Sequence, residues 1–230
     1  ANDGSNNGID LFIRSTGTTT LNHTKGELEP LDGVDWHHIV WTQNGAESVL
    51  YVDGVADTAD FNLNAFAPTE RFSDATAVNT TSIGGIRRGA PSHWITGLID
   101  EVGIWKRTLS ADEVVQLFDN VTPFPQESGL REGLVSHWPL DDLQGGKAVD
   151  VVSGMNMDAI NLSNADVVEG KNGNAFSFDA TKQTMLERLH AEGDPLPAHQ
   201  YDTLTISFWT KANAQEQFNE NGDPTNDRRF

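Results

Sequence analysis

The sequence predicts an all-β protein: a two-sheet antiparallel jelly-roll sandwich with one short helix after its last strand. Short runs rich in β-branched and aromatic residues recur along the chain, separated by turns that contain glycine, proline and asparagine. Two of these runs, at 36–43 and 48–54, flank the dipeptide Asn44-Gly45, which is the strongest short-range signal for a β-hairpin. A helical pattern occurs at 109–120 in this otherwise strand-like sequence.

The first half of the chain contains the expected hairpin and the strands around it. The run IDLFIRS alternates apolar and polar residues, as a half-buried strand does. The other runs are short, rich in valine, isoleucine and tryptophan, and bounded by turn residues. The expected strands of this half are residues 9–15, 36–43, 48–54, 81–86 and 97–105.

The single expected helix has a recognisable start. Ser110 is a good N-cap residue, and Glu113 follows three positions later, which is the pattern of a capping box. Val114, Leu117 and Phe118 form one apolar stripe at helical spacing. The helix ends before Asn120, because the following residues form a connector that contains proline.

Strands resume after the connector. The runs expected to be strands are 133–141, 175–180 and 202–212. The last is the most regular: Ile206, Phe208 and Thr210 are expected on one face, and the residues between them on the other.

Length and composition limit the possible functions. The 230 residues suit one large all-β domain or two small ones. A net charge of −19 disfavours nucleic acid and anionic lipid as partners and attracts divalent cations. The absence of cysteine excludes disulfides, thiolate zinc sites and a cysteine nucleophile. No apolar run approaches the about 18 residues of a membrane-spanning helix, so membrane insertion is not expected.

No catalytic constellation is recognisable. A retaining glycosidase of the sandwich type needs carboxylates that face one side of the sugar about 5 Å apart. These enzymes carry the carboxylates on one strand, in the pattern Glu-x-Asp-x-x-Glu. Glu27 and Glu29 share a face, but Pro30 follows directly and the third carboxylate of that pattern is missing. No G-x-S-x-G elbow occurs, and the adjacent His37 and His38 point to opposite faces of their strand. We therefore predict that the protein is not an enzyme.

Several motifs together carry a family resemblance. In the first half they are W-H-H-I-V-W-T at 36–42, L-Y-V-D-G at 50–54, I-G-G at 83–85 and G-L-I-D-E-V-G-I-W-K-R-T-L-S-A-D-E-V at 97–114; in the second half they are G-L-V-S-H-W-P-L-D-D at 133–142, D-V-V-S-G at 150–154, E-G-K-N-G-N-A-F-S-F-D at 169–179 and L-T-I-S-F-W-T-K-A at 204–212. With these motifs the chain resembles laminin G-like domains of the concanavalin A-like lectin/glucanase superfamily. The resemblance implies the sandwich fold and says little about the ligand.

The two halves of this domain stand in exchanged order. Residues 1–120 resemble the C-terminal half, residues 121–132 form a connector, and residues 133–230 resemble the N-terminal half. One explanation is a window cut from tandem repeats. The other is that the halves complete one sandwich, within the chain or with a neighbouring chain. The first and last strands of this fold are neighbours, so a short connector can join them, and neither half alone covers its apolar strand faces.

The resemblance also implies a structural calcium ion, held near Asp100 together with Asp150. The alternative for Asp100 is a hydrogen bond to backbone in a turn. Glu101 follows Asp100 directly, so the two carboxylates are expected on opposite faces of their strand. For a ligand, the candidates are Trp94 with Arg87, Arg88 and His93, because Trp94 is near a loop and the arginines suit an acidic polysaccharide.

The expected function is that of an extracellular or cell-surface recognition and adhesion module that binds a glycan or another cell-surface polymer. The alternative is a structural repeat of an extracellular filament or surface layer, in which copies of the chain complement one another. A third possibility is a spacer within a larger cell-surface enzyme.

Overall fold

Strands make up most of the computed structural model of this protein. The structure describes residues 9–14, 20–25, 28, 31–45, 47–57, 72–75, 78–87, 90–119, 129–196 and 200–212. Within these ranges one α-helix occurs, α1 (Ala111–Asp119), and it follows the strand Gly97–Trp105. The prediction of an all-β sandwich with one short helix is confirmed.

The strands are numbered along the chain. Those before α1 are β1 (Asp10–Arg14), β2 (Thr20–Lys25), β3 (His37–Asn44), β4 (Glu47–Val52), β5 (Val55–Asp57), β6 (Thr80–Ile83), β7 (Ile86–Arg87), β8 (Pro91–Ser92) and β9 (Gly97–Trp105). Those after it are β10 (Leu134–Trp138), β11 (Leu143–Gln144), β12 (Lys147–Ala148), β13 (Met157–Ile160), β14 (Val167–Glu169), β15 (Asn174–Phe178), β16 (Met185–Leu189) and β17 (Thr203–Ala212). Three short 3-10 helices are η1 (Phe72–Asp74), η2 (Gly129–Arg131) and η3 (Asn164–Asp166).

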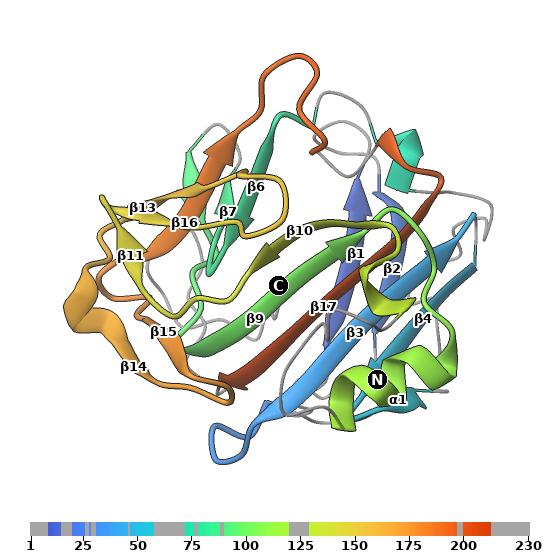
Figure 1. The fold of residues 1–230 in the computed structure, drawn as a ribbon, viewed down its shortest axis with the longest axis horizontal. Helices are drawn as coiled ribbons and strands as arrows, with labels where there is room; N and C mark the ends of the chain where they lie inside the picture. The colour runs from blue at the N-terminus through green and yellow to red at the C-terminus, as the bar shows by residue number, and fades with distance from the viewer. Residues whose placement is uncertain are drawn as a thin grey trace.

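The large sheet interleaves strands from the two halves of the chain. Its order is β14-β15-β9-β17-β3-β4-β5, and β10 also pairs with β9. Strand β17, from the second half, is antiparallel to both β3 and β9, so Ile206 lies opposite Trp41 on one side and Ile104 on the other. Figure 1 shows β17 in red between the blue β3 and the green β9. The central strand of this sheet is thus supplied by the second half.

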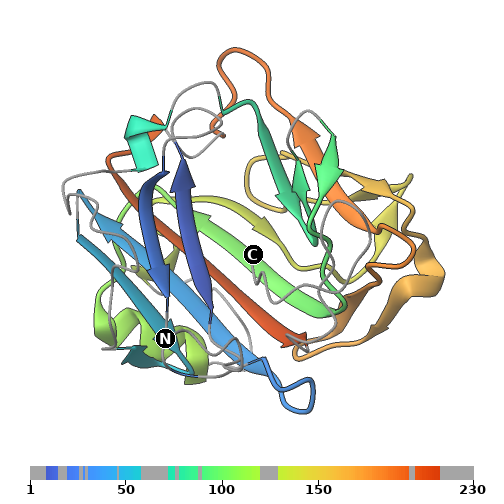
Figure 2. The same cartoon turned by 180° about the vertical axis from the view of Figure 1, so that it is seen from behind.

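A smaller sheet and a hairpin accompany the large sheet. The five-stranded sheet has the order β11-β12-β13-β16-β6, and here too β6 of the first half pairs with β16 of the second. The hairpin β1–β2 lies against the face of the large sheet that is turned to the viewer in Figure 2, opposite the face that carries α1 in Figure 1. We call the α1 side the outer face and the opposite side the inner face.

The main core fills the space between the two sheets. Large apolar side chains of the large sheet, such as Trp138, Phe176 and Phe178, are fully buried there against Met157 and Leu186 of the smaller sheet. Burial of such side chains is the main favourable contribution to folding, at about 25 cal/mol per Å² of apolar surface. The period-2 alternation of the strands sends these side chains inward.

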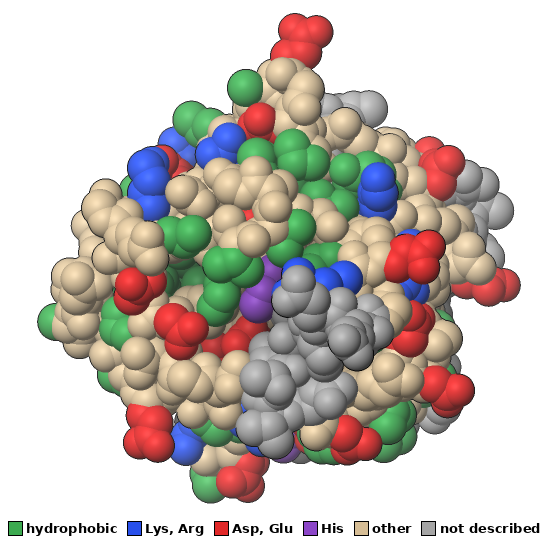
Figure 3. Space-filling view, viewed as in Figure 1, with side chains coloured by type: hydrophobic (Ala, Val, Ile, Leu, Met, Phe, Trp, Pro, Cys, Tyr) green, Lys and Arg blue, Asp and Glu red, His purple; other side chains and the backbone are tan. Residues whose placement is uncertain are grey.

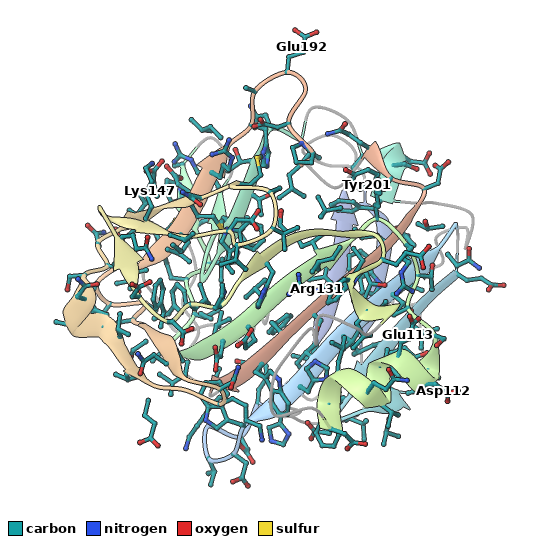
Figure 4. All side chains as sticks on the ribbon, viewed as in Figure 1. Asp112, Glu113, Arg131, Lys147, Glu192 and Tyr201 are labelled. Carbon is teal, nitrogen blue, oxygen red and sulfur yellow. The ribbon has the colours of Figure 1, made fainter. Side chains whose placement is uncertain are left out.

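Helix α1 covers part of the outer face. Val114 and Leu117 are buried there against Val40 and Trp105. The predicted capping box is confirmed, because Ser110 N–H donates to Glu113 Oε2 at 2.9 Å and Glu113 N–H donates to Ser110 Oγ at 3.3 Å. Figure 4 shows Asp112 and Glu113 on this first turn, where acidic side chains favour the positive end of the helix dipole.

Candidate functional site

Asp100 lies in a bulge of β9. In the pairing with β17, Gly103 is opposite Ser207, whereas Asp100 is opposite Trp209, so β9 has one residue more than its partner here. Glu101 adopts the left-handed conformation, with φ of 54°. Such a backbone conformation is uncommon for a residue other than glycine and reorients the side chains of a strand.

The bulge overturns the expectation that the two carboxylates face apart. Asp100 Oδ2 accepts hydrogen bonds from the backbone N–H groups of Lys171, at 2.8 Å, and Asn172, at 3.0 Å. Glu101 Oε1 accepts from the side-chain Nδ2 of the same Asn172, at 2.7 Å. Both acids therefore converge on one turn, because the extra residue breaks the strict alternation of the strand.

The turn at 170–174 approaches Asp100 very closely. A Cβ on Gly170 would lie 2.7 Å from Asp100 Oδ2 and 2.5 Å from the backbone oxygen of Asn174. Only glycine leaves room for this approach. The other end of the turn is held by Asp141, which follows β10, because Asp141 Oδ1 accepts from Asn174 N–H at 2.8 Å. The turn thus bridges carboxylates from two segments.

Asp100 is a buried acid whose negative charge is only partly compensated by hydrogen bonds. Its side chain is fully buried, and among the described residues its Oδ1 atom has no hydrogen-bond partner. The pKa of Asp100 is raised to about 7. Burial is the largest cause and the negative charges of Glu101 and Asp141 act in the same direction, whereas the hydrogen bonds from Asn172 and Lys171 oppose them. A buried oxygen without a partner is uncommon in folded proteins and calls for a physical explanation.

Sequence reasoning did not predict that Glu101 is buried and paired with a histidine. Glu101 is 4% exposed and its Oε2 lies 2.5 Å from His137 Nε2 on β10. Glu101 and His137 are far apart in sequence, and they meet because His137 pairs with Gly103 in the sheet. The family-like motif around 133–142 contained His137, but nothing in it indicated this partner.

Asp150 has a different environment. Its Oδ1 accepts from the N–H groups of His137, Val152 and Ser153, at 3.0, 2.9 and 3.3 Å. Its Oδ2 accepts from Ser153 Oγ at 2.6 Å and from Met155 N–H at 3.2 Å. Burial alone would raise the pKa of Asp150, but these hydrogen bonds outweigh it and hold the pKa below its usual value. Asp150 orders its own turn and connects to the Asp100 region only through His137.

The residues around Asp100 have the donor chemistry that calcium prefers. Within the described ranges, no three His, Asp or Glu side chains are grouped in a way that would hold a metal by themselves. Calcium, however, takes backbone carbonyls and waters beside a few carboxylates. The unpartnered Asp100 Oδ1 next to the charges of Glu101 and Asp141 fits such an ion, since a cation would remove the cost of burying that charge.

The other sequence candidates lie on the smaller sheet and its neighbours. Arg87, on β7, pairs with Glu187 at 3.2 Å. His93 has a φ of 53° and its Nδ1 lies 2.9 Å from Ser92 Oγ. Trp94 is 5% exposed and packs with Met185, so its ring is no open platform for a sugar, although its Nε1 lacks a partner. Arg88 lies outside the described residues.

The outer face beside α1 holds a stack of rings. His38 lies 4.9 Å from Trp209 between ring centroids, and Phe118 of α1 stacks on Trp209 at 5.7 Å. Lys171 Nζ lies 4.2 Å from the centroid of the Trp209 ring, in cation–π range. His38 Nε2 is 2.8 Å from Ser207 Oγ. The turn that binds Asp100 therefore also contacts this stack through Lys171.

Figure 3 shows the outer side of the molecule as a surface. Acidic side chains are spread over it, and groups of apolar side chains lie between them. Charges distributed in this way suit a protein that stays dissolved and meets polar partners.

An antiparallel two-sheet jelly roll with a short helix on its outer face is an architecture of lectin-like binding domains. Residues 2–115 match the family model described as the Concanavalin A-like lectin/glucanases superfamily, and this matched part of the chain belongs to that superfamily. No curated protein and no solved structure matched the chain. Laminin G-type members are in general non-catalytic binding domains and typically extracellular. In the described part of the chain, no helix has the length and apolar character needed to cross a membrane.

Proposed function

We propose that the protein is a non-catalytic extracellular recognition and adhesion module that binds a glycan and carries a structural calcium ion. The observation that carries the proposal is the match to a lectin-like superfamily on a two-layer sandwich. The chain's acidic charge supports a neutral or cation-bridged partner over nucleic acid or anionic lipid. Binding of the whole chain to an array of neutral and acidic oligosaccharides tests the glycan part of the proposal.

The calcium ion would be held at Asp100. Asp100 Oδ1 would supply a ligand, and the carboxylate of Asp141 lies at the other end of the same turn. The ion would supply positive charge where three acids meet and so fix the turn at 170–174 to β9. Asp150 belongs to the original pair of candidates, but the five hydrogen bonds it accepts favour a role in ordering its own turn.

Calcium is expected to raise the melting temperature, and Asp100→Asn is expected to abolish that increase. A ligand at about a hundred times its Kd stabilises by about 2.7 kcal/mol, which is about 5–10 °C for a domain of this size. In chelator, Asp100→Asn is expected to melt at or above the wild type, because the amide replaces a carboxyl whose charged form is costly to bury. Scanning calorimetry with calcium and with chelator measures both.

The matched control is Asp142→Asn, since Asp142 is exposed and its carboxylate oxygens lie 3.5 Å from Gln144 Nε2. This variant should keep the full calcium response. A wild-type melt that is insensitive to chelator, or an Asp100→Asn variant that keeps the response, would count against the site.

The second candidate function is a structural repeat of an extracellular filament or surface layer. The observation that favours it is the interleaving of the halves, because the ladders of β17 with β3 and β9 would form equally well between neighbouring copies. Light scattering over a range of concentrations distinguishes the two. A recognition module is expected to stay monomeric, whereas a complementing repeat is expected to grow into chains as concentration rises.

A further inference from the structure

Three buried side-chain atoms that have no hydrogen-bond partner in the described part of the chain lie on the inner face of the large sheet, near the β3–β4 turn. They are Trp41 Nε1, Gln43 Nε2 and Ser48 Oγ. Trp41 is 8% exposed and Gln43 is 1% exposed, while Ser48 is half-buried. The backbone groups here are paired in the β3–β4 ladder, so the deficit lies in the side chains alone.

The pairing of the strands explains why these atoms are neighbours. Gln43 and Ser48 are cross-strand partners, so their side chains share a face, and Trp41 lies two residues before Gln43 on that face. Phe72 of η1 packs edge-on against Trp41, with 6.0 Å between ring centroids. Its backbone N–H donates to Gln43 Oε1 at 2.9 Å. This bond fixes the amide, so Gln43 Nε2 is left as a donor that points elsewhere.

The chemistry of the set selects its ligand. Trp41 Nε1 and Gln43 Nε2 only donate, and Ser48 Oγ donates or accepts, so the complement is an oxygen acceptor. Apolar side chains such as Leu204 and Phe72 pack around the set. Asp57, on β5 next to β4, is buried on the same face, and the chain as a whole is strongly acidic. An anion is therefore disfavoured, and a neutral, hydroxyl-bearing ligand with an apolar face fits best, as a sugar ring has.

The set lies close to the rim of the sandwich. The next cross-strand pair outward, Asn44 and Glu47, is exposed. Across from it, Ser73 Oγ of η1 donates to Asp202 Oδ1 at 3.0 Å, and Asp202 precedes β17. Tyr201 marks this rim in Figure 4, near η1. Ser48 is therefore separated from the exposed end of the hairpin by one residue pair.

We propose that this rim of the inner face binds a neutral sugar residue, whose oxygens accept hydrogen bonds from Trp41 Nε1 and Gln43 Nε2 and bond to Ser48 Oγ. This inference rests on the proposed glycan-binding function and gives it a location. The site is separate from the turn at 170–174, and it is separate from the Arg87, His93 and Trp94 region.

The test is binding of the full chain to an array of neutral and uronate-containing oligosaccharides, followed by titration of the best neutral binder. The variant Trp41→Phe with Ser48→Ala removes a donor and a hydroxyl and keeps the aromatic ring. Gln43→Glu keeps the acceptor for Phe72 N–H, removes the amide donor and places a negative charge beside the sugar oxygens. Both variants are expected to weaken binding of the neutral glycan at least tenfold, with circular dichroism unchanged. Glu47→Gln, at the exposed neighbouring pair, should bind as the wild type does.

The outcomes separate this inference from the proposed function. A wild type that binds no oligosaccharide overturns the glycan-binding function and the site with it. A wild type that binds, with Trp41→Phe/Ser48→Ala and Gln43→Glu unaffected, overturns the site alone and indicates that the three atoms hold only a structural water. Preference for uronate-containing oligosaccharides also overturns the site, because the set contains no cation. If one variant misfolds, the other still decides the question.

Discussion

Replacing Gly97 with alanine is expected to lower the stability of the protein by about 3–5 kcal/mol. Gly97 begins β9 and is paired with Ala212 of β17 on one side and with Phe178 of β15 on the other. A Cβ there would lie 2.6 Å from the Cα of Ala212, and the φ of 146° is one that residues with a side chain rarely adopt. The clash is with backbone, so no rotamer change relieves it, and the strand pairing itself must open.

Thermal unfolding followed by circular dichroism measures this effect. For a chain of this size the loss corresponds to a decrease of about 10 °C in Tm. Gly193→Ala is the matched control, because Gly193 also has a positive φ, of 88°, but nothing lies within 4 Å of its Cβ position. If Gly97→Ala melts within about 3 °C of this control, β17 does not pair with β9 as described.

The contribution of His38 to the pH dependence is expected to lower the free energy of unfolding by about 3 kcal/mol as the pH falls from 6.5 to 4. The pKa of His38 is lowered to about 4. Burial is the largest cause, Asp53 opposes the shift, and the charge of Lys171 adds to it. Between these pH values the unfolded chain binds a proton at His38 and the folded chain does not. Protonation therefore favours the unfolded state, and the loss is complete once the pH falls below the folded-state pKa.

The difference between the wild type and His38→Gln isolates this contribution. Asp100 acts in the opposite direction, because its pKa is raised to about 7 and its stabilising effect is lost as the pH increases through that value. Both proteins carry Asp100, so its effect cancels when their unfolding free energies in urea are subtracted at each pH. Equal slopes for wild type and His38→Gln would show that His38 is not buried in its neutral form.

The fold was largely predictable because its signals are local. Asn44-Gly45 between two β-rich runs predicted the hairpin, and β3 and β4 pair there, with Asn44 opposite Glu47. Ser110 and Glu113 predicted the start of α1, which begins at Ala111. These signals depend only on neighbouring residues, so a single sequence contains them completely.

The candidate site was less predictable because it depends on contacts between distant segments. Alternation placed Asp100 and Glu101 on opposite faces, but the bulge brings both to Asn172, about seventy positions away. Trp94 was expected near the surface, yet it packs against Met185 of β16. Gln43 looked like an ordinary strand residue. Its missing partner became evident only when the position of Phe72 fixed its amide.

The position of β17 also has a consequence for how the chain acquires its structure. Strands β3 and β9 emerge from the ribosome before β17, although β17 lies between them in the sheet. During synthesis the edges of β3 and β9 that later pair with β17 therefore stay unpaired. The pairings that β17 makes also span long stretches of sequence, such as Val40 with Ser207. Long-range pairing of this kind folds slowly and leaves edges open to other chains in the meantime. We therefore expect folding to be completed only after translation of β17 and to depend on low concentration or chaperones until then.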